Sequence, residues 1–568
     1  MRPDIADFYL GVSRDAAGLF APRPAGGGDG WLFCVFAPHA RRVQVLGDWN
    51  GWDLYSAAEL TPCEDGLWRG KAVGARQGQL YKYNILCADG VWRLRTDPFA
   101  PGYEPSAVAA ARLQGLPCPP APLRPAAGAD HPLNIYELHA GSWRRHWDGR
   151  YYRFDALADR LVPWAVEHHF THIELMPPAE YPFDGSWGYQ LTGYFAPSAR
   201  FGGADAFVRL VERCHGAGLG VLADFVPIHF APDDGALTWY DGTALFEAGP
   251  SVWGSLVFDL ASGPVRSFLL SAACRWVGDL GCDGLRVDAV GYALNRWPGG
   301  EAASFFRLLT DTLHARYPGV LLIAEDTLPG CRATAPTDEG GLGFDYVWDA
   351  GPMRALADTL AAPFGCRGEG PVFGWTGERC VQAFSHDDCA WPGGALLPRL
   401  YGDRMQQFAQ ARLFLLYQTA LPGKQLIFSG CEFGQLAPFD PGREPDWYLL
   451  ADGEHRALSD YCGALWQFYA GHPALFREGS GAAFHLAANG PVRAWVRRAD
   501  GETLLCVFNL EPASRPGVRL DLGMPSCRGQ LREIFGTGAT APVPTAQVWD
   551  GQVTLELPGF CGAVLTLC

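Results

Sequence analysis

Two opposite charges stand two residues apart in the apolar segment GLRVDAV, residues 284–290. Side chains two apart in a strand share one face, so Arg286 and Asp288 are expected to project together. Because burying either charge alone is unfavourable, an apolar strand with no special role would contain neither. The pair is therefore either a structural ion pair or a catalytic carboxylate that a neighbouring arginine keeps ionised.

Two further carboxylates also follow apolar runs. Glu325 comes directly after VLLIA, and Asp387 comes after VQAFSH. Retaining glycosyl chemistry needs a nucleophile, a protonated acid and negative charge near an oxocarbenium-like transition state, and Asp288, Glu325 and Asp387 would supply all three. A carboxyl group removed from water has a raised pKa, as a general acid requires, and this suits Glu325.

Other polar residues stand at comparable places. Asp224 ends the apolar run GVLAD, and His386 lies next to Asp387. His386 could donate a hydrogen bond to sugar hydroxyls. His229 could do the same, or it could be a structural histidine with satisfied hydrogen bonds.

The elements that must position these residues lie within 133–480, where apolar, strand-like runs alternate with helical stretches. There are eight such runs: 134–141, 172–178, 220–227, 283–290, 320–326, 344–349, 381–388 and 424–430. Eight buried strands with helices between them predict an α/β fold, a (β/α)8 TIM barrel, as the catalytic domain. The candidate acids fall at the carboxyl ends of the runs, where such barrels carry their active sites.

The flanking parts have a different pattern. Residues 1–114 contain short alternating strands and predict an N-terminal β-sandwich, residues 115–132 form a Pro/Ala-rich linker, and residues 481–568 predict a C-terminal all-β domain, a second β-sandwich. The turn GDWNGWD places Trp49 and Trp52 on a loop tip. They could pack beneath the loop or form a possible glycan-contacting surface.

Composition excludes some classes of partner. The 568 residues contain 45 basic and 61 acidic side chains, and a net charge of −16 argues against nucleic acid or an anionic membrane as a partner. The 20 Trp and 20 Tyr are natural platforms for sugar rings, although most aromatic side chains fill cores. The 17 cysteines lack CxxC or Cys/His metal spacing. With no signal peptide and no apolar run long enough for a bilayer, the sequence predicts a soluble cytoplasmic protein with no metal site.

The motifs resemble those of a known superfamily. The segments DFVPIHF, GLRVDAV, IAED and FSHDD resemble, in order, the four signature segments of the α-amylase superfamily (glycoside hydrolase family 13). Longer segments look like those of the 1,4-α-glucan branching enzymes of glycogen synthesis: 182–202, 240–247, 340–349, 402–413 and 422–435. Segment 36–53 resembles the carbohydrate-binding module of those enzymes, and 136–145 resembles the entry to their barrel.

The resemblance implies roles for particular residues. Asp288 would be the nucleophile, Glu325 the general acid/base, and Asp387 a third carboxylate that holds the hydroxyls of the reacting sugar. The implied substrate-binding residues are Tyr189, Asp224, His229, Arg286 and His386. The implied enzyme is a monomer that needs no cofactor. It takes α-1,4-glucan (amylose or glycogen) as both donor and acceptor, and forms α-1,6 branches.

Some positions depart from the family pattern. Ile228 stands where calcium-binding amylases have an asparagine, so no such metal site is expected. Asp326 and Asp388 stand where branching enzymes usually have glutamate, CAWPGG follows SHDD, and the segment between Asp288 and Glu325 is short for this family. These changes bear on the chain-length preference and on the outcome of transfer, and they leave the chemistry intact. Two alternatives stay open: an α-glucan hydrolase of the same superfamily, debranching or trehalose-releasing, and a non-catalytic glucan-binding protein. The intact carboxylates argue against the second.

Overall fold

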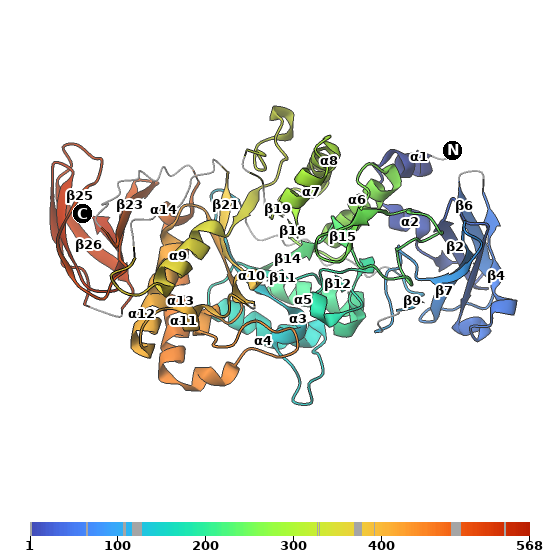
Figure 1. The fold of residues 1–568 in the computed structure, drawn as a ribbon, viewed down its shortest axis with the longest axis horizontal. Coiled ribbons are helices and arrows are strands. Elements are labelled where there is room, and N and C mark those ends of the chain that lie inside the picture. Colours follow the sequence, from blue (N-terminus) through green and yellow to red (C-terminus); the bar gives the residue numbers. More distant parts are fainter. Residues whose placement is uncertain are drawn as a thin grey trace. The chain divides into compact units, whose positions relative to one another are not determined.

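The computed structural model describes residues 3–63, 66–105, 109–115, 128–325, 328, 330–367, 378–390, 392–478, 490–538 and 541–568. Figure 1 labels the helices and strands of the chain. The chain divides into two compact units. The first unit contains residues 1–124, 139–160 and 175–344, and the second contains residues 125–138, 161–174 and 345–568.

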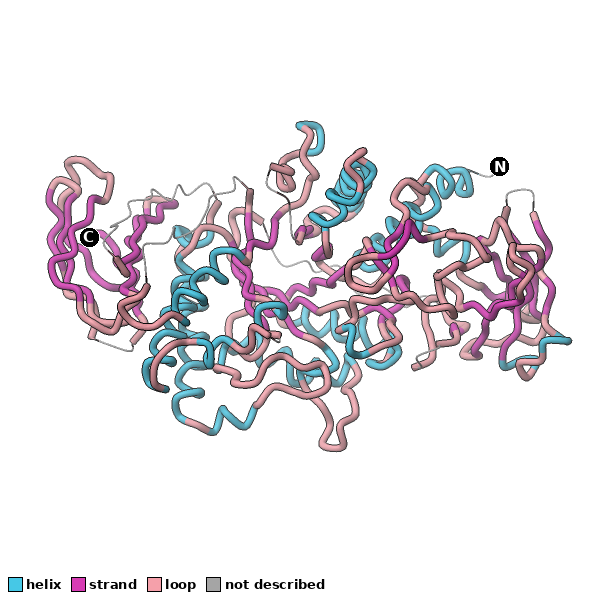
Figure 2. The backbone as a smooth tube through the Cα atoms, viewed as in Figure 1, coloured by secondary structure: helices cyan, strands magenta, loops and turns pink. Residues whose placement is uncertain are grey.

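The N-terminal part of the first unit is built mainly of strands, drawn in magenta in Figure 2. Its two helices are α1 (Pro3–Leu10) and α2 (Ala16–Phe20). One sheet has the order β1 (Arg23–Pro24), β2 (Trp31–Phe36), β6 (Leu67–Ala72) and β5 (Thr61–Pro62). The other has the order β4 (Ala58–Glu59), β3 (Arg42–Gly47), β7 (Leu80–Leu86) and β8 (Trp92–Arg95), and β9 (Ala111–Arg112) pairs with β7. The Phe33 ring on β2 contacts those of Tyr81 and Tyr83 on β7, with centroids 5.4 and 6.2 Å apart, so the two sheets share a core and the predicted N-terminal β-sandwich is confirmed.

Eight strands close into a barrel, and each matches one of the eight predicted apolar runs, although the strand that begins at Cys380 starts one residue before its run. In order they are β10 (Asn134–Leu138), β11 (His172–Leu175), β14 (Gly220–Phe225), β18 (Gly284–Val287), β19 (Leu321–Ala324), β20 (Tyr346–Asp349), β21 (Cys380–Phe384) and β22 (Lys424–Phe428). Within the first unit β14, β18 and β19 pair in parallel, and within the second β20, β21, β22 and β10 do the same. Every residue of β14, β18 and β19 is buried, as expected of strands covered on both faces. The predicted TIM barrel is confirmed.

Helices and short sheets connect the barrel strands, and two further helices, α13 (Gly453–Gly471) and α14 (Pro473–Phe476), follow the last of them. The connecting helices are α3 (Ala140–Trp143), α4 (Phe154–Glu167), α5 (Gly203–Gly216), α6 (Gly263–Gly278), α7 (Val290–Arg296), α8 (Glu301–Arg316), α9 (Gly351–Ala361), α10 (His386–Cys389), α11 (Leu396–Arg399) and α12 (Arg404–Ala420). Two small antiparallel sheets extend from the first unit's strands: β12 (Ala179–Glu180) with β13 (Gly193–Pro197), and β15 (His229–Phe230) with β17 (Leu256–Phe258) and β16 (Glu247–Pro250). The sequence specifies helix starts locally: Asp403 and Gln406 exchange side-chain to backbone hydrogen bonds of 2.9 Å and form a capping box before α12.

The C-terminal part holds one antiparallel sheet rather than the predicted sandwich of two. Its order is β23 (Val492–Ala499), β24 (Glu502–Asn509), β29 (Gly562–Leu567), β26 (Gly529–Gly536), β27 (Ala546–Trp549), β28 (Gln552–Leu557) and β25 (Arg515–Asp521), a half-barrel (Figure 1, red). Because β26 pairs with β29 and β25 with β28, every strand joins the same sheet around one apolar core. Alternation along a strand predicts one apolar face, but it does not specify which strands pair, and this is why the sandwich was wrong.

The domain boundaries at residues 114, 132 and 480 stay predictions, since residues 116–127 of the expected linker and 479–489 lie outside the described ranges. Among the helices that the structure describes, none is both long and apolar enough to cross a membrane.

A buried lysine closes the amino end of β22. The Lys424 ammonium donates to the carbonyl oxygens of Ala129, His131 and Phe476 at 3.1, 2.7 and 2.8 Å, and the side chain is almost fully buried. Burial lowers the pKa of Lys424 to about 8. One side chain therefore satisfies three backbone acceptors from two separate segments.

We expect Lys424→Met to lower the thermal midpoint of unfolding by about 2 °C or more, since buried acceptors without a donor cost roughly 1–3 kcal/mol each. Differential scanning calorimetry measures the shift. The control is Lys71→Met, which removes a partly exposed ion pair with Asp29 and should change stability by less than about 1 kcal/mol. Equal midpoints for the two variants would contradict the structural role of Lys424.

Candidate active site

The register of three parallel strands gathers charged residues at one edge of the first unit. Asp224 on β14 lies beside Arg286 on β18, and β18 in turn pairs with β19, after which Glu325 follows. Gly284 permits the close pairing of β18 and β19, because a Cβ there would lie 2.1 Å from the carbonyl oxygen of Leu321. Parallel strands end at the same edge, so these carboxylates meet there.

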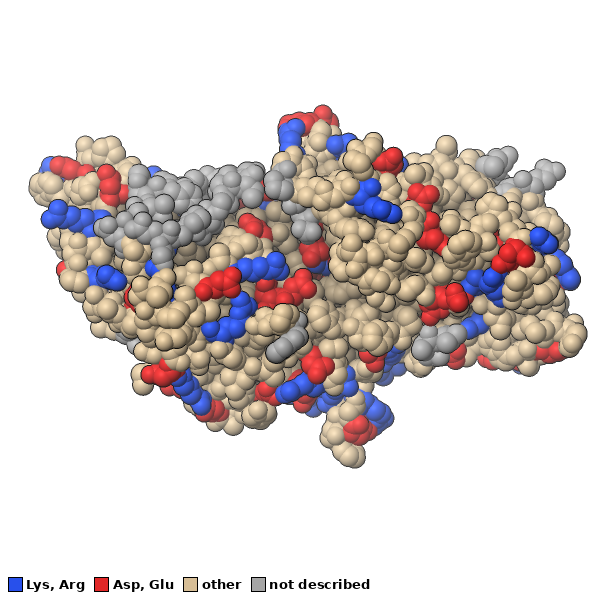
Figure 3. Space-filling model, viewed as in Figure 1, with Lys and Arg blue, Asp and Glu red and all other residues tan. Residues whose placement is uncertain are grey.

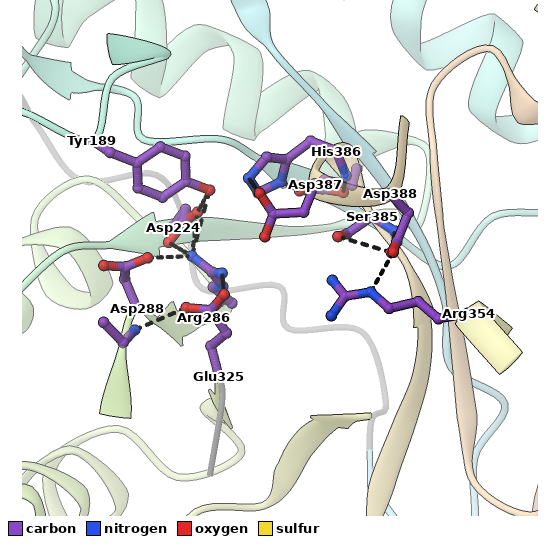
Figure 4. Close-up of polar contacts among 12 residues, drawn as sticks. Tyr189, Asp224, Arg286, Asp288, Glu325, Arg354, Ser385, His386, Asp387 and Asp388 are labelled. Carbon is purple, nitrogen blue, oxygen red and sulfur yellow. Dashed lines mark hydrogen bonds and ion pairs between the residues drawn. The ribbon is translucent and has the colours of Figure 1, made fainter. Parts of the chain in front are cut away.

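The Arg286 guanidinium binds three carboxylates (Figure 4). One terminal nitrogen lies 2.7 Å from both oxygens of Asp224 and 3.0 Å from Oδ1 of Asp288. The other lies 2.7 Å from Oε1 of Glu325. The arginine is 1% exposed, so water does not screen these interactions appreciably. The structural and catalytic interpretations of the Arg286–Asp288 pair are thus compatible, because one buried cation joins both predicted catalytic groups.

Two further contacts orient the predicted catalytic carboxylates. The backbone N–H of Ala289 donates to Oε2 of Glu325 at 2.8 Å, and Ala289 has a left-handed backbone with φ 54°. Nε2 of His229 lies 3.4 Å from Oδ2 of Asp288. The predicted residues Asp288, Glu325 and His229 are therefore brought together, and Ala289 joins them through a main-chain group that its side-chain type could not indicate.

Tyr189 lies above this group. Its hydroxyl donates to Oδ2 of Asp224 at 2.6 Å, and the Arg286 guanidinium lies 5.8 Å from the centre of its ring. The loop that carries Tyr189 is fixed by turns at Asp184–Trp187 and Ser186–Tyr189, each closed by a backbone hydrogen bond. One face of the tyrosine ring is thus held over the arginine-carboxylate group.

The two predicted catalytic carboxyls have opposite pKa shifts. Burial raises the pKa of Asp288, but the contact with His229 and the charge of Arg286 outweigh burial and hold its pKa below the usual value. Burial raises the pKa of Glu325 to about 8; Arg286 opposes this and the charge of Asp288 adds to it. At neutral pH Asp288 is thus ionised and Glu325 protonated, as a nucleophile and an acid must be.

The pKa of Asp224 is also raised, but less than that of Glu325. Burial raises its pKa to about 6, with the Arg286 charge opposing and the Asp288 charge adding to the rise. Its two oxygens accept hydrogen bonds from Arg286 and Tyr189, so its side chain is held in place by partners that line the same site.

The second unit holds the other predicted residues, after β21. The backbone N–H of His386 donates to Glu137 at 2.9 Å, and its Nδ1 also binds Glu137, which is fully buried on β10. Nε2 of His386 lies 3.6 Å from Oδ1 of Asp387, whose side chain is 49% exposed. Glu137 thus fixes the imidazole while Asp387 remains open to solvent and a ligand.

Asp388, one of the departures from the family pattern, has defined partners. It accepts hydrogen bonds from the backbone N–H of Ser385 at 2.9 Å and from the Ser385 hydroxyl at 3.3 Å, and it pairs with Arg354 (Figure 4). The shorter side chain therefore caps α10 and reaches an arginine on α9. Asp326, the other departure, lies outside the described residues.

Sequence reasoning did not identify Glu137, which binds the predicted site residue His386, or Arg354, which binds Asp388. Glu137 interrupts the apolar run NIYEL, and an isolated carboxylate in such a run was an available signal. Nothing in the local sequence of Arg354 indicated its contact with Asp388.

The two tryptophans of the N-terminal loop differ in environment. Trp49 is half-buried and its ring lies 6.1 Å from that of Phe33, whereas Trp52 is more exposed and donates from Nε1 to Asp48 at 2.9 Å. A glycan-contacting role for Trp49 and Trp52 stays a prediction. Within the described ranges, no cluster of His, Cys, Asp or Glu side chains has an arrangement that could hold a metal ion.

Residues 10–100 match the family of carbohydrate-binding module 48 (isoamylase N-terminal domain). Two solved structures share the fold at low sequence identity. The apo pullulanase of Paenibacillus barengoltzii has a TM-score of 0.75 at 17% identity, over 96% of this chain and 94% of that one. The GBS pullulanase SAP, in complex with maltotetraose, has a TM-score of 0.74 at 16% identity, over 97% and 88%.

Curated relatives are much closer in sequence. The 1,4-alpha-glucan branching enzyme GlgB of Dechloromonas aromatica is 38% identical over 89% of this chain and 88% of that protein. The enzyme of the same name from Pseudomonas fluorescens is 38% identical over 99% and 82%. The chain therefore belongs to the 1,4-alpha-glucan branching enzyme family of the α-amylase superfamily.

Proposed function

We propose that this protein cleaves an α-1,4 bond of a glucan by a retaining double displacement and transfers the chain held on Asp288 to a 6-hydroxyl, which forms an α-1,6 branch. The observation that supports this most directly is the pair of opposite pKa shifts at Asp288 and Glu325, which bind the two terminal nitrogens of one buried arginine. Family membership supplies the substrate class, α-glucan.

In the first step a carboxylate oxygen of Asp288 attacks the anomeric carbon and the bond from that carbon to O4 of the next glucose breaks. Glu325 gives its proton to the departing O4, so the leaving chain ends in a neutral hydroxyl and Glu325 becomes a carboxylate. The product is a glycosyl ester on Asp288. The Ala289 N–H, which binds Glu325, would hold the acid toward the leaving oxygen.

In the second step Glu325 takes the proton of an incoming 6-hydroxyl, whose oxygen attacks the anomeric carbon and releases the Asp288 carboxylate. Water competes for the same intermediate. Transfer exceeds hydrolysis only if a bound chain presents its hydroxyl in line, an orientation advantage that reaches about 10⁵ M or more in well-ordered systems.

The remaining predicted residues would bind the reacting sugar. The ring of Tyr189 would stack against it, while Asp224, His229, His386 and Asp387 would bind its hydroxyls. Asp387 is suited to this by its exposure, and His386 by the fixed orientation that Glu137 gives it. Convergence of Asp387 with Asp288 and Glu325 is part of this proposal.

A hydrolase is the second candidate, favoured by the departures that follow Asp387. Asp388 binds Arg354 and the segment CAWPGG comes next, so the surroundings of an acceptor chain could differ from those in relatives that branch. We further propose a cytoplasmic monomer that binds neither nucleic acid nor membrane. On the face drawn in Figure 3, basic and acidic side chains are intermixed. This supports the absence of a nucleic acid or membrane partner, because nucleic acids and anionic membranes favour concentrated positive charge.

The pKa shifts predict the pH dependence of kcat/KM. Activity requires Asp288 ionised and Glu325 protonated, so the rate should fall in acid, below the usual range of an aspartate pKa, where Asp288 gains its proton, and above about pH 8, where Glu325 loses its own. Rates with amylose across pH 3–10 test this. An alkaline limb near the ordinary glutamate pKa, about 4.3, would exclude Glu325 as the acid.

Glu325→Gln should lower turnover of amylose by about 10²–10⁴-fold, because the sugar leaving group needs a proton. The same variant should still release fluoride from an α-maltosyl fluoride in the first turnover, since fluoride leaves without an acid. A stopped-flow fluoride burst measures this step. Glu339→Gln, at an exposed glutamate, is the matched control and should match wild type on both substrates. Equal loss on both by Glu325→Gln would assign Glu325 another role.

Product analysis tests the function itself. Incubation with amylose should lower iodine staining and create α-1,6 linkages seen by NMR, while few reducing ends appear. Isoamylase treatment should then release short linear chains. Asp288→Ala should abolish every change and the exposed-site control Asp29→Ala none. If reducing ends rise as iodine colour falls and no α-1,6 linkages form, the protein is a hydrolase.

A further inference from the structure

An exposed tryptophan lies one side chain away from the predicted nucleophile. Trp253 occupies the turn between β16 and β17, and its ring centre is 5.1 Å from that of His229, which contacts Asp288. On another side the ring meets Tyr292 of α7, with centres 4.6 Å apart. Although two rings pack against it, Trp253 remains 48% exposed.

The turn that carries Trp253 is fixed before any ligand binds. The Ser251 hydroxyl accepts hydrogen bonds from the backbone N–H of Trp253 at 3.0 Å and of Ser255 at 3.1 Å, and it lies 2.6 Å from the Ser255 hydroxyl. The backbone N–H of Ser251 also donates to the Ser255 carbonyl at 2.8 Å. Little conformational entropy is therefore lost when a ligand covers the indole.

The chemistry of the surface fits a sugar chain. A half-exposed indole offers a flat apolar face, and the C–H faces of a glucosyl ring are apolar while its rim carries hydroxyls. An indole needed only to support His229 would be stabilised by further burial, yet almost half of it faces solvent. Its position beside His229 makes a neighbouring sugar of the same chain the natural occupant.

We infer that Trp253, with Tyr292 beside it, forms a glucosyl-binding subsite adjacent to the sugar that reacts with Asp288, and that this subsite takes a glucose unit of an α-1,4-glucan chain. The inference rests on the proposed function for the direction of the chain through the site. Loss of the subsite would reduce affinity for long glucans and leave the chemistry of the reacting sugar unchanged.

The test measures binding without turnover. In a Glu325→Gln background, calorimetric titration with maltoheptaose should give a Kd about five- to tenfold higher for Trp253→Leu and within about twofold of the parent for Trp253→Tyr, which keeps an aromatic face. Trp549→Leu is the matched control, because Trp549 is an exposed tryptophan on the C-terminal sheet, and it should leave the Kd unchanged. Unchanged affinity for Trp253→Leu would overturn the subsite.

A second measurement separates sugar binding from support of His229. With Glu325 intact, release of fluoride from α-glucosyl fluoride, which fills only the reacting position, should stay within about twofold in Trp253→Leu. A large fall in that rate with unchanged maltoheptaose affinity would mean that Trp253 only positions His229. If the wild-type protein releases no fluoride, the proposed function fails, while the titration still decides whether the subsite exists.

A third measurement needs no substitution at Trp253. In the Glu325→Gln protein, saturating maltoheptaose should protect Trp253 from oxidation by N-bromosuccinimide, read by peptide mapping, and leave the oxidation rate of Trp549 unchanged. Oxidation of Trp253 at the same rate with and without the sugar would refute the inference even if Trp253→Leu failed to fold.

Discussion

The site depends on one constraint: a single buried guanidinium faces three carboxylates. One positive charge cannot compensate the negative charges of Asp224, Asp288 and Glu325 together in a low-dielectric environment. A proton therefore has to remain on one of the three carboxyl groups. Glu325 keeps it most strongly because burial disfavours its charged form, and the charges of Asp288 and Asp224 add to this effect. Asp288 loses its own because His229 and Arg286 both favour the ionised form. The proposed assignment of acid and nucleophile thus depends on the position of one arginine.

The same constraint changes during the proposed reaction. Formation of the glycosyl ester removes the negative charge of Asp288, and with it one cause of the raised pKa of Glu325. The pKa of Glu325 is then lower, so its carboxyl group is ionised at the stage when the proposed mechanism needs it as a base. Arginine suits this arrangement because its fixed fork addresses two carboxylates from separate nitrogens and stays charged throughout.

Much of the barrel and of the candidate site could be predicted from the sequence, for physical reasons. Barrel strands buried on both faces appear as continuous apolar runs, so all eight were visible, and a carboxylate ending such a run is conspicuous. The spacing of Arg286 and Asp288 predicted that they share a face. That Arg286 also binds Asp224 and Glu325 depends on the register between strands, which no local pattern specifies.

Contacts between distant segments were harder to predict from the sequence. Glu137 and His386 are 249 residues apart, and their hydrogen bonds exist only because β10 and β21 both flank β22. Likewise the C-terminal strands were predictable individually, but their pairing into one sheet was not. Trp253 gave no periodic signal, since its environment comes from a turn and from side chains on other elements.

At Ala289, whose backbone is left-handed, stability and activity favour different residues. A residue with a Cβ in this conformation stores about 1–2 kcal/mol of local strain, which glycine would relieve. Glycine would also widen the range of directions open to the amide that binds Glu325. Selection for a more heat-resistant chain would therefore favour glycine at this position, whereas selection for turnover would retain alanine.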